Sequence, residues 1–110
     1  PFIEEIHHAR KLDSPSGTAI TLADCISEKH HGYDGWKFDH ATDEKQIPVR
    51  SIREGAIPGI HTVIWDSDVD AITLRHESKS RKGLALGALI AAEFIQHRKG
   101  VFTMSDVLGF

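Results

Sequence analysis

The alternation of apolar and polar residues divides the chain into strand-like and helix-like segments. The opening run FIEEIHHA, residues 2–9, alternates loosely and is rich in residues that favour strands. The next run, residues 16–31, has small and apolar residues at helical spacing, and Ser16 stands where a helix N-cap is expected. The pattern therefore predicts a strand followed directly by a helix.

Three further strands are predicted in the middle of the chain. The runs IPVRSIRE (residues 47–54), IHTVIWDS (60–67) and AITLRHES (71–78) combine β-branched residues with alternation. The first two are joined by GAIPG, whose glycines and proline indicate a turn or a bulge. The polar stretch from about Gly32 to Lys45 predicts a long loop.

The last third of the chain predicts a long helix and a short one. Residues 80–99 are apolar nearly all round the helix, with Ser80 as its expected N-cap, which is typical of a helix buried on most sides in a core or at a subunit interface. The sequence TMSD, residues 103–106, has the pattern of a capping box that opens a final short helix.

This order of elements predicts an α+β fold. Consecutive strands with short links favour antiparallel pairing, so we expect a mixed, largely antiparallel sheet with helices packed on one face and the sheet used for oligomerisation. The 110 residues suit one domain, residues 1–110. No glycine-rich phosphate loop follows a strand, so a doubly wound nucleotide-binding fold is not expected.

Composition excludes several classes of function. The net charge of -3 does not support a general nucleic-acid partner. No apolar run reaches the ~18 residues of a membrane span. The single cysteine, Cys25, cannot form an internal disulfide, so a reducing, cytoplasmic location is expected. Because the chain opens on Pro1 and enters a strand at once, we expect it to be a piece of a longer protein.

The segment HHARKLDSPSGTA, residues 7–19, concentrates the candidate chemistry. Gly17 and Thr18 stand where the helix begins, and the first N–H groups of a helix form an anion site together with its dipole. Pro15 stiffens the approach to this turn. A plain N-cap is the simpler interpretation of Ser-Gly-Thr taken alone.

The cations next to this helix start change that interpretation. His7, His8, Arg10 and Lys11 all precede it, and a cation beside a helix N-terminus is unfavourable unless an anion lies between them. A histidine can also donate a proton near neutral pH, and Asp13 could orient Lys11 or a histidine. Together these features predict an anion-binding catalytic site.

The remaining polar clusters are given simpler interpretations. The eight histidines are scattered and show no H-x-x-x-H spacing, so no metal is expected. Arg53 and His61 flank the GAIPG link and are interpreted as turn chemistry and a polar sheet face.

The segment EIHHARKLDSPSGTA closely resembles the signature E-x-H-H-x-x-K-x-D-x-P-S-G-T-A of the dihydrodipicolinate reductase (4-hydroxy-tetrahydrodipicolinate reductase) family. The matching residues are Glu5, His7, His8, Lys11, Asp13, Pro15, Ser16, Gly17, Thr18 and Ala19. The resemblance continues through IREGAIPGIHTVIW, ITLRHESKSRKGLALGALIAA and GVFTMSDVLGF, and is weakest between about Gly32 and Lys45.

The resemblance implies a specific function. Enzymes of this family reduce 4-hydroxy-tetrahydrodipicolinate to tetrahydrodipicolinate in lysine and diaminopimelate biosynthesis, with an N-terminal Rossmann domain for NADH or NADPH. Their C-terminal domain binds the substrate and builds a tetramer through its sheet. This chain resembles only that second domain, so it is expected to bind no cofactor and to be inactive alone.

Roles for individual residues follow from the same resemblance. His7 would donate the proton that completes the reduction, and Lys11 would assist it or bind the substrate. His8, Gly17 and Thr18 would bind the dicarboxylate substrate. Because neighbouring residues of a strand point to opposite faces, His7 and His8 can serve one pocket only if the strand ends or bulges there.

Two alternatives belong to other classes of function. One is a non-catalytic fragment that only oligomerises, because no source of hydride binds to it. The other is a small metal-binding protein.

Overall fold

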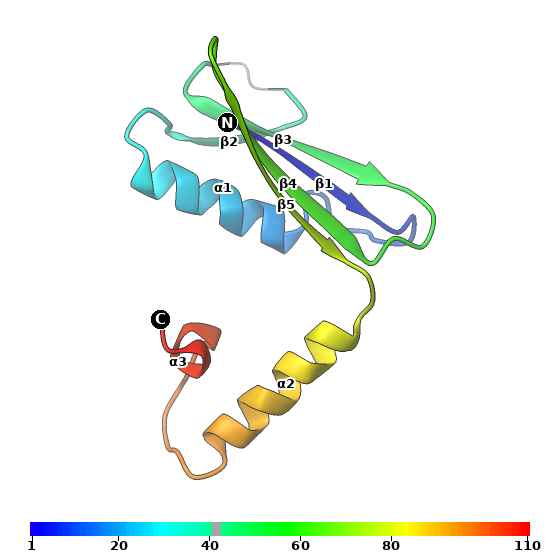
Figure 1. Cartoon of the computed structure of the whole chain (residues 1–110), viewed down its shortest axis with the longest axis vertical. Coiled ribbons are helices and arrows are strands. Elements are labelled where there is room, and N and C mark those ends of the chain that lie inside the picture. The colour runs from blue at the N-terminus through cyan, green and yellow to red at the C-terminus, as the bar shows by residue number, and fades with distance from the viewer. Residues whose placement is uncertain (41–42) are drawn as a thin grey trace. The chain divides into compact units, whose positions relative to one another are not determined.

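The computed structural model describes residues 1–40 and 43–110. It contains a five-stranded sheet and three helices (Figure 1). The elements are β1 (Phe2–His7), α1 (Gly17–Lys29), β2 (Gly35–Phe38), β3 (Gln46–Arg53), β4 (Gly59–Asp66), β5 (Ala71–Ser78), α2 (Lys82–Ile95) and α3 (Met104–Leu108). The chain divides into two compact units, residues 1–79 and 80–110.

The sheet of the first unit is mixed, as predicted, with strand order β2-β3-β1-β4-β5. β1 pairs in parallel with β3 and antiparallel with β4, β2 pairs in parallel with β3, and β4 pairs antiparallel with β5. Two of these four pairings between described strands are therefore parallel, which gives parallel pairing a larger share than the sequence indicated.

Two predictions about the sheet are wrong. The stretch predicted as a loop contains β2, which lies at an edge of the sheet; residues 41–42 of that stretch lie outside the described residues. β3 and β4 are not paired as neighbours, because β1 lies between them and pairs with both. The short link between them favoured antiparallel pairing, but β1, which alternates between buried and half-buried residues, pairs with a strand on each side.

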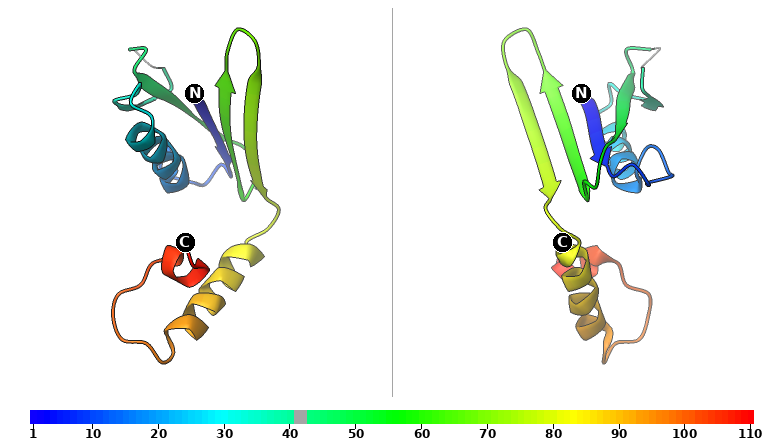
Figure 2. Two further views of the ribbon diagram at one scale, coloured as in Figure 1. Left: turned by 60° about the vertical axis from the view of Figure 1, so that its left-hand side comes forward. Right: turned by 90° about the vertical axis from the view of Figure 1, so that its right-hand side faces the viewer.

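α1 packs on one face of this sheet, as both views of Figure 2 show. The core between them is formed by Ile3, Ala19, Ala23, Ile47, Val49 and Val63. The alanines let the helix approach the sheet closely, while the β-branched residues fill the sheet side. Trp65 and Leu22 extend this core at its margin.

The second unit is a pair of helices. The Phe94 and Phe102 rings pack edge to face at 5.5 Å, and the Arg98 guanidinium lies 4.1 Å from the Phe94 ring centroid. The predicted capping box is present, because the Asp106 carboxylate accepts from the N–H of Thr103 at 2.6 Å.

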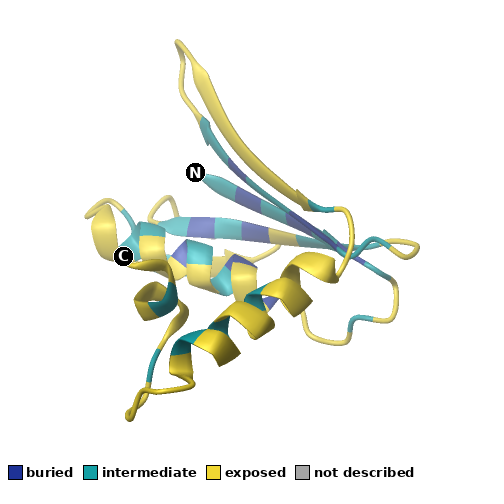
Figure 3. Cartoon of the chain, turned by 60° about the horizontal axis from the view of Figure 1, so that its bottom comes forward, coloured by how far each residue is buried: buried dark blue, intermediate teal, exposed yellow. Residues whose placement is uncertain are grey.

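The burial predicted for α2 is not found in this unit. The structure describes every residue of α2, and none of them is buried (Figure 3). Its exposed large side chains are Leu84, Leu86, Leu89, Ile90 and Ile95. A unit of 31 residues has too little chain to enclose a 14-residue helix. Ser80 precedes the N-cap position, which Arg81 occupies. Among the described helices, none has the length and apolar character to cross a membrane.

Candidate functional site

The face of β1 that meets α1 changes from apolar to polar along the strand. Alternate residues share one face of a strand, so Ile3, Glu5 and His7 all point toward the side of α1. Ile3 belongs to the apolar core. Glu5 is fully buried and His7 is 8% exposed, so the carboxyl end of β1 encloses two ionisable groups.

The Glu5 carboxylate is the centre of a buried network. Arg53 donates to both of its oxygens, from Nη1 to Oε2 at 2.9 Å and from Nη2 to Oε1 at 2.8 Å. The backbone N–H of Ser16 donates to Oε1 at 3.2 Å. His7 Nδ1 forms a short hydrogen bond with Oε2. The strand register explains this arrangement, because β3 runs parallel to β1 with Arg53 opposite His7.

These partners keep Glu5 ionised. Burial by itself would raise the pKa of this carboxyl, but Arg53, Ser51 and His7 beside it outweigh burial and lower the pKa to about 2. A bidentate guanidinium is a strong partner for a carboxylate because two parallel hydrogen bonds add to the attraction of charge. The Glu5 carboxyl group is therefore ionised at neutral pH.

His7 lies between this anion and the start of β4. Its Nδ1 is engaged by Glu5, and its ring meets that of His61 edge to face, with centroids 5.0 Å apart. A Cβ atom at Gly59 would lie 3.0 Å from His7 Nε2. The absence of a side chain at Gly59 is therefore what leaves room beside this nitrogen.

His61 has a different partner from His7. Its Nε2 lies 3.0 Å from the Ser16 hydroxyl. Burial first, and then the neighbouring His7, lower the pKa of His61, while the Glu5 carboxylate acts in the opposite direction. Of these two adjacent imidazoles, His7 is the one that is hydrogen-bonded to the Glu5 carboxylate. We call Glu5, His7, Ser16, Arg53 and His61 the Glu5 cluster.

The N-terminus of α1 adjoins this cluster. The Ser16 hydroxyl accepts from the N–H of Ala19 at 3.3 Å, which confirms Ser16 as the N-cap. Gly17 and Thr18 form the exposed first turn, and the described chain supplies no hydrogen-bond acceptor to either N–H. Apart from its chain neighbours and the backbone of its own helix, no described atom lies within 4 Å of a Cβ placed on Gly17, so this helix end is open to an anion.

Lys11 is held near the same place by the loop between β1 and α1. Its Nζ lies 2.8 Å from the Asp13 carboxylate, and this contact lowers the pKa of Asp13. Arg53 Nη2 also donates to the carbonyl oxygen of Asp13 at 2.7 Å, which ties the loop to the sheet. The suggestion that Asp13 orients Lys11 is thus confirmed, and the Lys11 side chain is 21% exposed.

β1 ends at His7, so His8 is no longer part of the strand. The backbone N–H of His8 donates to the carbonyl oxygen of Ile57 at 2.8 Å, and its carbonyl oxygen accepts from the N–H of Lys11 at 3.0 Å. Because the strand ends at His7, the two histidines do not have to point to opposite faces, and both can serve one pocket.

Comparison with known proteins identifies the family. The family model described as dihydrodipicolinate reductase, C-terminus, matches residues 2–108. The chain belongs to this family.

Named dihydrodipicolinate reductases align over nearly all of the chain. It is 55% identical over 106 residues to the 4-hydroxy-tetrahydrodipicolinate reductase of Christiangramia forsetii, covering 96% of the chain and 44% of that protein. It is 38% identical to that of Thermosipho africanus, covering 96% of the chain and 42% of that protein. The chain therefore spans less than half the length of these curated relatives.

A solved structure supports the same relation. The chain superposes on a dipicolinate-bound dihydrodipicolinate reductase from Paenisporosarcina sp. TG-14 with a TM-score of 0.67 and 27% identity. The match covers 91% of this chain and 41% of that one.

Sequence reasoning missed three members of the Glu5 cluster in this reductase segment. Glu5 was given no role, although its position two residues before His7 puts both on one strand face. Arg53 and His61 were interpreted as turn chemistry and a polar sheet face, but Arg53 binds Glu5 and His61 lies beside Ser16. The sequence did offer one signal for Arg53 and His61, because they lie near the ends of two strands that a single short link joins.

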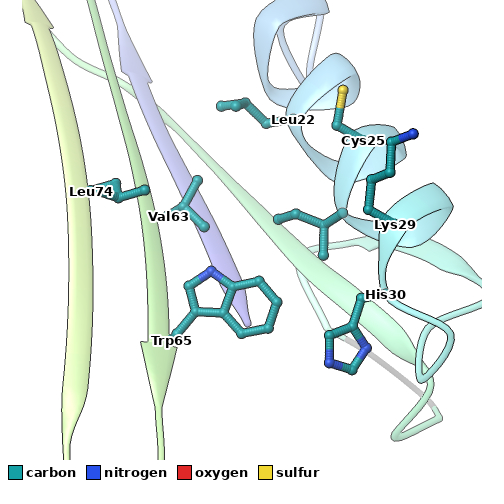
Figure 4. A pocket seen from close by; sticks show the side chains of 8 residues that line it. Leu22, Cys25, Lys29, His30, Val63, Trp65 and Leu74 are labelled. Atoms are coloured by element: carbon teal, nitrogen blue, oxygen red, sulfur yellow. The ribbon is translucent and has the colours of Figure 1, made fainter.

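A separate groove in this unit has a mainly apolar lining. It encloses about 400 Å³ along the C-terminal half of α1 (Figure 4). Its lining is Leu22, Cys25, Ile26, Lys29, His30, Val63, Trp65 and Leu74. The Glu5 cluster lies at the opposite end of α1, beside Ser16. In residues 1–40 and 43–110, no three His, Cys, Asp or Glu side chains are grouped to hold a metal ion.

Proposed function

We propose that this chain is the substrate-binding domain of a two-domain reductase that converts 4-hydroxy-tetrahydrodipicolinate to tetrahydrodipicolinate with NADH or NADPH. The observation that carries the proposal is a buried His7 paired with an ionised Glu5, next to an open helix N-terminus and Lys11. The names of the relatives and the dipicolinate-bound neighbour support it. The reaction belongs to lysine and diaminopimelate biosynthesis.

The substrate is a ring with two carboxylates, and this end of the unit offers partners for one of them. The N–H groups of Gly17 and Thr18 and the Thr18 hydroxyl bind a carboxylate oxygen, and Lys11 supplies the charge. His8 adds a further contact to the same dicarboxylate. Asp13 keeps Lys11 extended toward the site until the substrate takes its place.

His7 completes the reaction as a proton donor. The chemistry that a nicotinamide would supply, when held by the nucleotide domain, is the hydride for one ring carbon. The Nε2 of protonated His7 then gives a proton to the neighbouring ring position, and Lys11 assists by stabilising charge on the substrate. With the 4-hydroxyl group leaving as water, the gain of one hydride and one proton gives tetrahydrodipicolinate.

The nicotinamide is held elsewhere in the protein. No residue of this chain is assigned to it, because the sequence has no glycine-rich fingerprint. The 110-residue chain alone is therefore expected to show no turnover with NADH or NADPH, and any such turnover would refute this division of roles. A cytoplasmic location suits the single Cys25.

Titration of dipicolinate (pyridine-2,6-dicarboxylate) into the chain tests the carboxylate site. Lys11→Ala removes a charge-assisted hydrogen bond, so we expect affinity to fall by about 1.5–3 kcal/mol, roughly 10- to 150-fold. Lys45→Ala is the matched control, since Lys45 also pairs with an aspartate, Asp34 at 3.9 Å, on the surface. Calorimetry measures both.

Gly17→Ala is a sharper variant because a methyl group there meets nothing within 4 Å beyond its chain neighbours and the backbone of its own helix. The fold should be kept, while the bound carboxylate is pushed away, so affinity should fall as far as in Lys11→Ala. Thr18→Val should cost less, because its N–H remains. His7→Ala should leave binding nearly unchanged and lower turnover in the two-domain protein. Wild-type affinity in both Lys11→Ala and Gly17→Ala would overturn the site.

We also propose a homotetramer. β5 exposes Ile72 and Leu74, and α2 exposes apolar residues along its length, which is more apolar surface than a monomer usually leaves open. Light scattering at micromolar concentration should report an oligomer. A monomer would instead contradict this part of the proposal.

A further inference from the structure

No step of the proposed reaction is assigned to Glu5 itself, yet its side chain is fully buried. Two residues earlier on the same face of β1, Ile3 contributes to the apolar core. A buried ion pair is seldom more stabilising than well-packed apolar side chains of similar size, because both charges lose their hydration. The need for a carboxylate at residue 5 therefore lies in what it does to its neighbours.

We propose that Glu5 is a positioning residue, which orients the His7 ring so that Nδ1 carries a hydrogen toward Glu5 and Nε2 faces the space beside Gly59. The inference rests on the proposed function, in which Nε2 of His7 gives up the proton. It adds a third member, the orienting group, to the pair of His7 and substrate.

The hydrogen bonds around Glu5 leave His7 one possible arrangement. An ionised carboxylate can only accept hydrogen bonds, and this one already accepts from Arg53 Nη1, Arg53 Nη2 and the N–H of Ser16. His7 Nδ1 must therefore donate to Oε2 as well. In neutral His7, Nε2 is then without a hydrogen and ready to take one up.

The carboxylate itself is held in place from two elements. Arg53 comes from β3 and grips both oxygens, while Ser16 comes from the start of α1. Because Arg53 also binds the carbonyl of Asp13, and Asp13 pairs with Lys11, the same network reaches the carboxylate-binding loop. Glu5 thus fixes the donor of the proton relative to the residues that hold the substrate.

The tautomer of His7 is measured directly by imidazole ¹⁵N NMR of the 110-residue chain above the pH at which His7 titrates, with His7→Gln to assign the signal. We expect Nδ1 protonated and Nε2 bare. A wild-type His7 with its hydrogen on Nε2 overturns the proposal, and this result needs no folded variant of Glu5.

Glu5→Gln is the decisive variant, because its amide NH₂ is a donor that faces other donors and can force the hydrogen onto Nε2. We expect Nε2 protonated, or a mixture of tautomers. Glu4→Gln is the matched control: Glu4 is the preceding residue, points to the other sheet face and lies 3.8 Å from Arg50. It should leave the His7 signal unchanged.

Kinetics in the two-domain protein give a second readout. Glu5→Gln should lower kcat by at least about tenfold, toward the ~10²–10⁴-fold that a positioned general acid contributes, with KM within about twofold of wild type. Wild-type kcat in Glu5→Gln overturns the proposal. If the wild-type protein shows no reductase activity, the proposed function fails, and the tautomer alone decides the role of Glu5.

Discussion

Ile3 and Glu5 lie two residues apart on the same face of β1, and both are fully buried. Around Ile3 the neighbouring strands contribute Val49 and Val63, and the surroundings are apolar. Around Glu5 they contribute Arg53 and His61, together with the start of α1. One sheet face thus carries a core at one end and an ionised network at the other.

Burial has opposite effects on the free energy of folding at the two ends of this face. Apolar burial stabilises the fold, at about 25 cal/mol per Å² removed from water. Burial of Glu5 costs desolvation that its hydrogen bonds and the Arg53 charge offset. The apolar end therefore holds the unit together, and the polar end is the place where chemistry is possible.

The largest effect on stability should come from the apolar end. Ile3→Ala removes a fully buried side chain that the sheet cannot refill, so the free energy of unfolding should fall by about 2–5 kcal/mol. Val69→Ala is the control, since Val69 is 90% exposed in the link between β4 and β5, and it should change stability far less. Urea denaturation compares them. Equal losses in the free energy of unfolding would contradict the placement of Ile3 in the core.

The polar end should make the stability of the fold depend on pH in the acid range. Because the folded pKa of Glu5 is about 2, below its ordinary 4.5, its contribution is complete above pH 4.5 and is lost as pH falls toward 2. At 1.36 kcal/mol per pKa unit, this loss is about 3 kcal/mol. Glu5→Gln should remove that part of the acid slope, whereas Glu4→Gln should keep it. Identical slopes in the two variants would argue against an ionised Glu5.

A smaller effect should separate the helix start from the helix interior. Ser16→Ala removes the acceptor of the Ala19 N–H and the hydroxyl beside His61, so about 1 kcal/mol of stability should be lost. Ser27 bonds the carbonyl of Ala23 within the helix, and Ser27→Ala should be neutral or slightly stabilising. Thermal melts of both variants measure this difference. A Ser16→Ala variant as stable as the wild type would contradict the expectation.

Local patterns predicted most elements because their causes are local. β5 was placed at its observed bounds, α1 and its Ser16 cap were found, and the capping box of α3 was recognised from four letters. β2 was missed because a four-residue edge strand carries too little alternation to stand out. The insertion of β1 between β3 and β4 was missed because pairing depends on residues more than forty positions away.

The sequence by itself determined the family, the mixed α+β fold and the motif from His7 to Thr18, since these follow from local spacing and from side-chain types in one unbroken run. Only the tertiary structure decided which residues meet there. Arg53 and His61 reach Glu5 and His7 because β3 and β4 both pair with β1, and Ser16 reaches Glu5 because α1 packs on that face. Hydrogen bonds act over about 3 Å, so strand order and register, which the local pattern does not encode, determine which charges are partners.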